Sequence, residues 1–202
     1  MPILAKAGGE RNPVSIGAHI GICVRIIDLG TQHSERFGTK QKKVMIVWEI
    51  PDETIIVDGK EMPKLISEEY TLSLGERANL RGTLEAWRGK QFTNEELEGF
   101  DLRNVLGHAC QLQVIHKENG YAKVNSVMSM LKNMERPKQI HPSIYFDLSD
   151  PSCVEMINEL PEWIQKKIWL SPEYREIAKL PELPSNDYYE NVSRGNDDDL
   201  PF

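Results

Sequence analysis

The 202-residue sequence has little of what most catalytic or metal-binding proteins require. Its three cysteines, Cys23, Cys110 and Cys153, lie far apart and form no CxxC pair, which argues against a disulfide framework or a zinc knuckle and fits a reducing cytosol. The motifs of P-loop nucleotide hydrolases, zinc proteases, serine hydrolases and zinc deaminases are absent. The five histidines are scattered. We therefore expect no metal, no cofactor and no enzymatic activity.

Long apolar runs are also missing. No run approaches the roughly 20 apolar residues of a membrane-spanning helix, and the first residues lack the apolar stretch of a signal peptide. We expect a soluble, cytoplasmic protein that has no membrane partner.

Positive charge is scarce overall, since the net charge is −7 and the isoelectric point about 5.3. The chain as a whole therefore lacks the basic composition of a nucleic-acid-binding protein. The charge is unevenly distributed, however. Residues 1–139 hold 19 Lys and Arg against 18 Asp and Glu, whereas residues 140–202 hold 5 against 13. The sequence thus predicts a nearly neutral body that carries an acidic tail.

Alternating apolar residues predict five strands, over 17–30, 42–50, 67–74, 107–117 and 121–130. An amphipathic helix with Leu80, Leu84 and Trp87 on one face separates the third strand from the fourth. Residues 31–41 are expected to form a loop, and 51–64 an insertion that turns at Asp58-Gly59. This order is that of an OB-fold, a mainly β, five-stranded and partly open barrel.

The alternation in 17–30 assigns Ile20, Ile22, Val24 and Ile26 to one face of the strand and Arg25 to the other. A one-residue error in phase would exchange the two faces. Assignments of outward-facing residues below depend on this phase.

The sequence divides into three parts. Residues 1–136 are expected to form the OB-fold domain, 137–182 a helical appendix, and 183–202 a disordered acidic tail. In the appendix, helices are predicted to begin at Pro151, Pro161 and Pro172, with Asp150 and Ser171 as N-caps. Earlier in the chain, Thr93 and Glu96 form the pattern of a capping box.

A protein that binds single strands needs a basic groove and a few rings on which bases stack. The best stacking candidates are Tyr121, between two lysines, and Phe37, whereas Trp48, Tyr70, Trp87 and Phe92 follow the core phase. For any single lysine, a solvated strand edge is the simpler interpretation. As a set, the predicted DNA-binding residues are Arg25, Phe37, Lys40, Lys42, Lys43, Arg88, Lys90, Gln111, Gln113, Lys117, Tyr121 and Lys123.

The sequence closes with Asp197-Asp198-Asp199-Leu200-Pro201-Phe202. These six residues resemble the tip of bacterial and phage single-stranded-DNA-binding proteins, in which an acidic tail ends in Asp-Asp-Asp-(Ile/Leu)-Pro-Phe. The 51–64 insertion and the helical appendix make the body look more like the divergent phage replication type. The resemblance implies sequence-independent binding of single-stranded DNA during replication or recombination, in a bacterial host cytoplasm. It also implies that the tip recruits replication or recombination proteins. Because the body is nearly neutral, we expect a homo-oligomer in which the groove is shared between protomers.

Two other classes compete with this interpretation. The first is an adaptor that does not bind DNA and docks a basic partner through its acidic tail. The second is a nuclease or annealing enzyme, which is disfavoured because a two-metal site needs several inward carboxylates and the predicted strands offer almost none.

Overall fold

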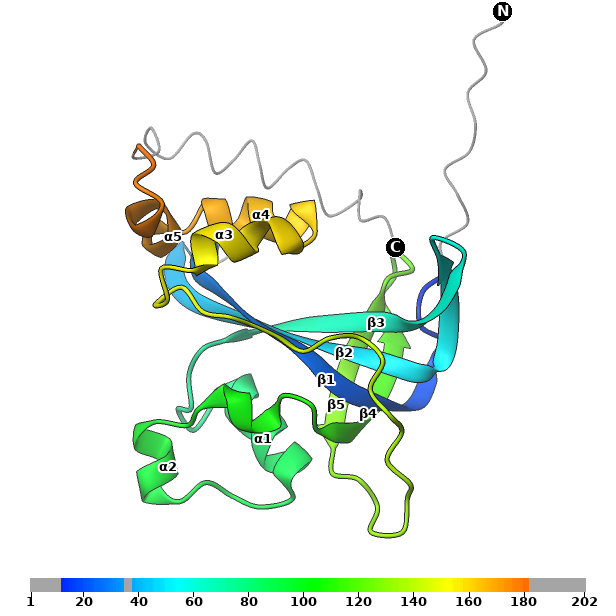
Figure 1. The fold of residues 1–202 in the computed structure, drawn as a ribbon. Helices are drawn as coiled ribbons and strands as arrows, with labels where there is room; N and C mark the ends of the chain where they lie inside the picture. Colours follow the sequence, from blue (N-terminus) through cyan, green and yellow to red (C-terminus); the bar gives the residue numbers. More distant parts are fainter. Residues whose placement is uncertain (1–11, 35–37, 182–202) are drawn as a thin grey trace, which may run out of the picture.

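The computed structural model describes residues 12–34 and 38–181 (Figure 1). This part is mainly β, with one six-stranded sheet in the order β3-β2-β1-β4-β5 and β6 paired with β1. Every pairing is antiparallel except β1 with β6. The strands are β1 (Gly17–Ser34), β2 (Thr39–Val57), β3 (Lys60–Thr71), β4 (Ala109–His116), β5 (Ala122–Met128) and β6 (Ile144–Phe146).

Helices lie on two opposite sides of the sheet (Figure 1). One group connects β3 to β4, and the other follows β6. The first comprises α1 (Asn79–Arg88), α2 (Asn94–Glu98) and η1 (Leu102–Val105). The second comprises α3 (Cys153–Met156), η2 (Ile157–Glu159), α4 (Glu162–Trp169) and α5 (Pro172–Ile177).

Local signals placed most helix starts correctly. The capping box of Thr93 and Glu96 is present at α2, and the Ser171 hydroxyl accepts a hydrogen bond from the Tyr174 amide at α5. The helix predicted from Pro151 begins instead at Cys153, because the Asp150 carboxylate accepts from the Ser152 amide within a preceding turn. The three-residue strand β6 was not predicted.

The predicted loop and insertion are largely strand. β1 continues to Ser34 and β2 starts at Thr39, so most of 31–41 belongs to the β1–β2 hairpin. The 51–64 segment is the outer arm of the β2–β3 hairpin, beyond a register shift between Ile50 and Thr54. Its turn lies at Asp58-Gly59, as predicted, and both residues have positive φ angles of 50° and 75°.

Two apolar cores lie on opposite faces of β1 and β2. The inner core lies between the curled sheet and α1 and includes Trp48, Leu84 and Trp87; Trp48 and Trp87 have ring centroids 5.8 Å apart. Helices α3 to α5 cover the outer face and form the second core, which includes Phe146 and Ile168. The appendix therefore packs on the sheet of its own chain.

The predicted phase of β1 is wrong after Val24, because Val24 and Ile26 lie on opposite faces and not on one. A register shift between Cys23 and Arg25 opposite β2 marks a bulge, which adds a residue and exchanges the faces. Ile26 consequently lies with Cys23 in the inner core, whereas Val24 lies in the outer core with Ile27. Periodicity alone could not reveal this, because both sets of side chains are apolar and both faces are covered.

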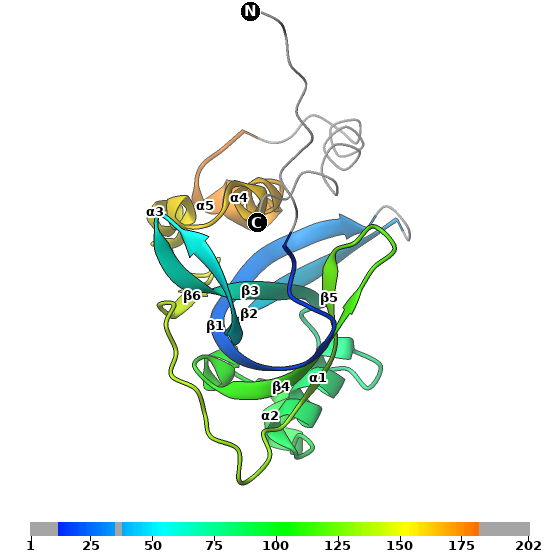
Figure 2. The ribbon, with the colours of Figure 1, turned by 90° about the vertical axis from the view of Figure 1, so that its right-hand side faces the viewer.

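The fold is mainly β, as predicted, but its sheet does not close into a barrel. It curls until β3 approaches β5 (Figure 2), and no β3–β5 ladder forms among the residues that the structure describes. The approach of these two strands leaves a seam in the sheet, and α1 packs beside it.

Candidate nucleic-acid interface

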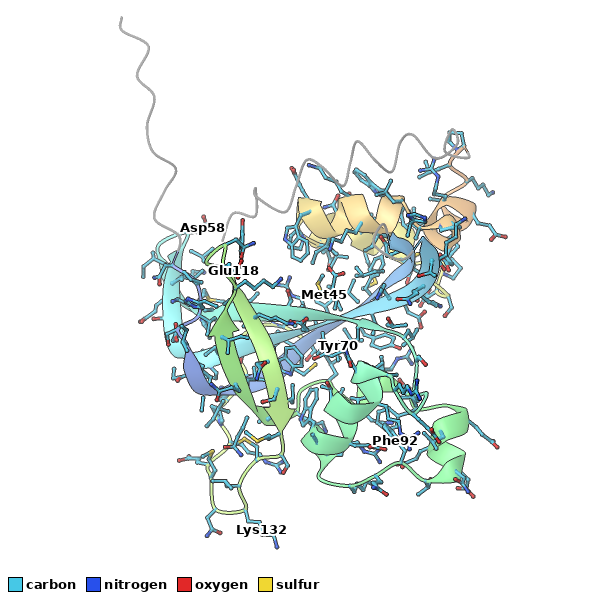
Figure 3. The ribbon with its side chains drawn as sticks, turned by 180° about the vertical axis from the view of Figure 1, so that it is seen from behind. Met45, Asp58, Tyr70, Phe92, Glu118 and Lys132 are labelled. Atoms are coloured by element: carbon cyan, nitrogen blue, oxygen red, sulfur yellow. The ribbon has the colours of Figure 1, made fainter. Side chains whose placement is uncertain are left out.

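A groove of about 490 Å³ lies at this seam, where β3, β5 and α1 meet. Tyr70 of β3 lies near α1 and β5 in Figure 3, and its ring is buried in the inner core. The groove is lined by Glu68, Tyr70, Glu76, Arg77, Ala78, Asn79, Arg81, Gly82, Thr83, Glu85, Lys123, Val124, Asn125, Ser126 and Val127. Most of these side chains are polar or charged, so the groove suits a polar ligand.

Glu68 bridges the two strands of the seam. Its carboxylate accepts a hydrogen bond from the Val124 amide. Burial raises the pKa of Glu68, while the charges of Lys123 and Lys117 and the Val124 hydrogen bond lower it in part. Two predicted DNA-binding lysines therefore lie close enough to this carboxylate to influence its ionisation.

The β4–β5 hairpin carries these two lysines beside the groove. Its turn is closed by a hydrogen bond from the Lys117 amide to the Tyr121 carbonyl, at 2.9 Å, and Gly120 provides the required positive φ of 82°. Lys117 is exposed, and Tyr121 and Lys123 are half-buried. Lys117, Tyr121 and Lys123 thus share one short hairpin at the rim of the seam.

The lysines of β2 form a second, separate group. The Lys43 ammonium donates to the Thr71 hydroxyl at 2.8 Å, and this hydroxyl donates to Gln41 at 3.0 Å. Lys42 lies 3.3 Å from the Asp28 carboxylate, and Lys40 is exposed near the start of β2. Of the three lysines, Lys42 is therefore partly neutralised within the protein.

Arg88 and Lys90 are engaged elsewhere. The Arg88 guanidinium forms an ion pair with Glu96 and lies over the rings of Phe92 and Phe100, 4.4 and 4.8 Å from their centroids. Lys90 lies 3.7 Å from the same Glu96 carboxylate. These contacts fix α2 against the end of α1, so Arg88 has a structural role.

Arg25 also lies away from the groove. In the register it is opposite Val47 of β2 and Ile144 of β6, on the face that α3 to α5 cover. Burial lowers the pKa of its guanidinium from the usual value. Arg25 therefore lies on the outer face, as predicted, but helices α3 to α5 cover this face, so it is not the free basic face that was expected.

The two glutamines of β4 keep the predicted outward phase, since Cys110, Leu112 and Val114 point into the inner core. Both Gln111 and Gln113 are half-buried. Gln111 donates to the Ser129 carbonyl at 2.7 Å and so fixes the end of β5.

The appendix covers part of the surface that OB-folds commonly use for ligands, the outer face of strands two and three. Met45 and Val47 of β2 are buried beneath it, and Leu65 of β3 packs against it. Lys167 of α4 forms an ion pair with Glu69 of β3. The open seam between β3 and β5 is therefore the more accessible polar surface.

Several predictions lie outside the described residues, among them Phe37 and the six tip residues 197–202. Within 12–34 and 38–181, no three His, Cys, Asp or Glu side chains are grouped so that they could hold a metal ion. None of the helices that the structure describes is long and apolar enough to cross a membrane. The buried assignments of Trp48, Tyr70, Trp87 and Phe92 are confirmed.

Comparison with known proteins finds no family model and no curated protein that matches this sequence.

Proposed function

We propose that the protein binds single-stranded DNA without sequence preference, in replication or recombination. The observation that carries the proposal is the position of Lys117, Tyr121 and Lys123 on one hairpin beside the polar groove at the seam. Cations beside a groove attract phosphates, and a ring on the same hairpin offers a surface for base stacking.

The topology is consistent with this proposal. A three-stranded meander, a helix and two further strands, with β1 paired to both β2 and β4, is the arrangement of an OB-like fold. OB-folds bind oligonucleotides through the loop between strands four and five, which here is the Lys117–Tyr121 turn. The fold supports the assignment without establishing it, because function is a property of the site.

The tip at residues 197–202 gives the second line of support. Three aspartates would steer it toward basic partner surfaces, and Phe202 would supply a ring for a pocket there. Pro201 would limit the entropy lost on docking. We propose that this segment recruits replication or recombination proteins to the coated strand.

The decisive test is the fluorescence anisotropy of labelled oligo-dT at several salt concentrations, with duplex DNA as a control. The proposal predicts binding to the single strand that weakens as salt rises, because bound lysines release counterions. The double variant Lys117→Gln with Lys123→Gln should bind about 25-fold more weakly at 0.1 M salt, from two lost phosphate contacts. Absence of binding at low salt, also after removal of residues 195–202, would refute the proposal and favour the adaptor.

A further inference from the structure

The segment from Ser129 to Ser143 is a long loop that joins β5 to β6 and was not among the predicted DNA-binding residues. It begins where β5 ends, so it continues the strand that lines the groove. Figure 3 shows Glu118 and Lys132 at opposite ends of the β4–β5 pair. A ligand that followed β5 from the hairpin turn would therefore reach this loop next.

Both ends of the loop are fixed to the sheet. At its start, the Ser129 carbonyl accepts from the Gln111 side chain at 2.7 Å. At its end, the fully buried Glu49 carboxylate accepts from the Ile140 amide at 2.9 Å, the His141 amide at 2.8 Å and His141 Nδ1 at 2.9 Å. These bonds set where the loop leaves and rejoins the sheet, which favours a binding surface over a passive linker.

The loop carries three cations that form no ion pair within the part of the chain that the structure describes. Lys132, Arg136 and Lys138 are exposed, and within the described residues none has a carboxylate at ion-pair distance. The loop contains a single acid, Glu135. By contrast, Lys42 is paired with an aspartate of the sheet.

Apolar side chains alternate with these cations. Leu131 is 61% exposed and Ile140 is 57% exposed, and Met134 is also exposed. A single exposed apolar side chain is ordinary, but several within one short loop offer a partner more apolar contact area. Beside phosphate-binding cations, they could pack against the faces of unpaired bases, which are apolar and accessible only in a single strand.

We infer that loop 129–143 is a second contact surface for single-stranded DNA, which extends the groove beyond the end of β5. Lys132, Arg136 and Lys138 bind phosphates, and Leu131 and Met134 lie against bases. The inference rests on the proposed function and deepens it, because it assigns a longer path to the same strand. The continuity of the loop with β5, which lines the groove proposed for DNA, favours DNA over an acidic protein partner.

The test compares two triple variants that remove equal charge. The loop variant is Lys132→Gln, Arg136→Gln and Lys138→Gln; the control is Lys60→Gln, Lys166→Gln and Lys179→Gln, at exposed positions outside the groove and the loop. Each is titrated with labelled oligo-dT of increasing length over a salt series. Thermal unfolding checks that both variants are folded.

The inference predicts that the loop variant binds long oligo-dT about 100-fold more weakly at 0.1 M salt than the wild type, and that its log–log salt slope is smaller by about 2. The affinity of both proteins should rise with the length of the oligo-dT up to a limit, and this limit should be reached at a shorter length for the loop variant than for the wild type. The control variant should lose much less affinity and keep the wild-type length dependence.

Equal affinities for the loop and control variants would overturn the inference. If the wild type still binds single-stranded DNA and the double variant Lys117→Gln with Lys123→Gln binds it more weakly, the proposed function is retained without the loop contact. If the wild type fails to bind any single strand, both fall. If the loop variant lost its binding to a labelled peptide of residues 195–202 while its DNA binding stayed unchanged, the loop would be assigned to protein docking instead.

Discussion

Glu49 offers a sharp test of how loop 129–143 is held, because its carboxylate is fully buried and accepts three hydrogen bonds. One oxygen accepts from the Ile140 amide and the other accepts twice from His141. In Glu49→Gln, one oxygen becomes an amide that can only donate. At least one hydrogen bond is then lost, and a donor faces a donor.

The expected cost follows from these contacts. A hydrogen bond to a charged acceptor contributes about 1.5 to 3 kcal/mol, and a neutral one about half as much. Losing one bond and weakening the other two by half should lower the free energy of unfolding by about 3 to 6 kcal/mol. The assay is urea unfolding, with Glu118→Gln at the exposed hairpin turn as a control that should change by less than about 0.5 kcal/mol.

Hydrogen exchange gives a second readout that is specific to the loop. The Ile140 and His141 amides should exchange faster in Glu49→Gln than in the wild type, while amides of the β1–β2 ladder far from the loop should change only with global stability. A variant that stays within about 0.5 kcal/mol of the wild type and keeps both amides protected would refute the reasoning.

Four further outcomes are expected. Ile168 is fully buried in the outer core, so Ile168→Ala should leave a cavity and lower the free energy of unfolding in urea by about 3 kcal/mol. Gly21→Ala should lower it by about 1 to 3 kcal/mol, because the added Cβ would lie 2.5 Å from a Leu112 methyl. Burial tends to raise the pKa of Glu53, but hydrogen bonds lower it to about 2. The stabilising contribution of its carboxylate should therefore be lost as the pH falls from about 5 toward 2. In acid titrations, Glu53→Gln should flatten the dependence of the free energy of unfolding on pH in this range. In anisotropy titrations, Glu68→Gln should strengthen DNA binding about 5-fold at 0.1 M salt, by removing a charge near the hairpin lysines.

Local patterns predicted much of the fold. The stripe of Leu80, Leu84 and Trp87 gave α1, and the Thr93–Glu96 pair gave the start of α2, because each depends on residues within one or two turns. The Asp58-Gly59 turn was predicted for the same reason. The strand β6 could not be predicted from alternation, since it has three residues and is stabilised by its pairing with β1.

The candidate site was harder to predict, because it depends on which charges meet. Sequence phase placed Lys43, Lys117 and Lys123 beside strands, but it could not show that Arg88 pairs with Glu96 or that Lys42 pairs with Asp28. Sequence phase placed Arg25 on an open outer face, but it could not show that helices α3 to α5 cover that face. The cations of loop 129–143 were overlooked because that segment shows no periodicity.

The outer core also changes where this chain can be divided. β6 pairs with β1, and the helices that follow it bury one face of β1 and β2, so a fragment that stopped at residue 136 would expose Val24, Ile27 and Met45 to water. Cleavage within loop 129–143 should behave differently from truncation. The two pieces would share a buried apolar interface and a strand pairing, so they should remain associated as a nicked but folded protein, and separately produced halves should complement each other.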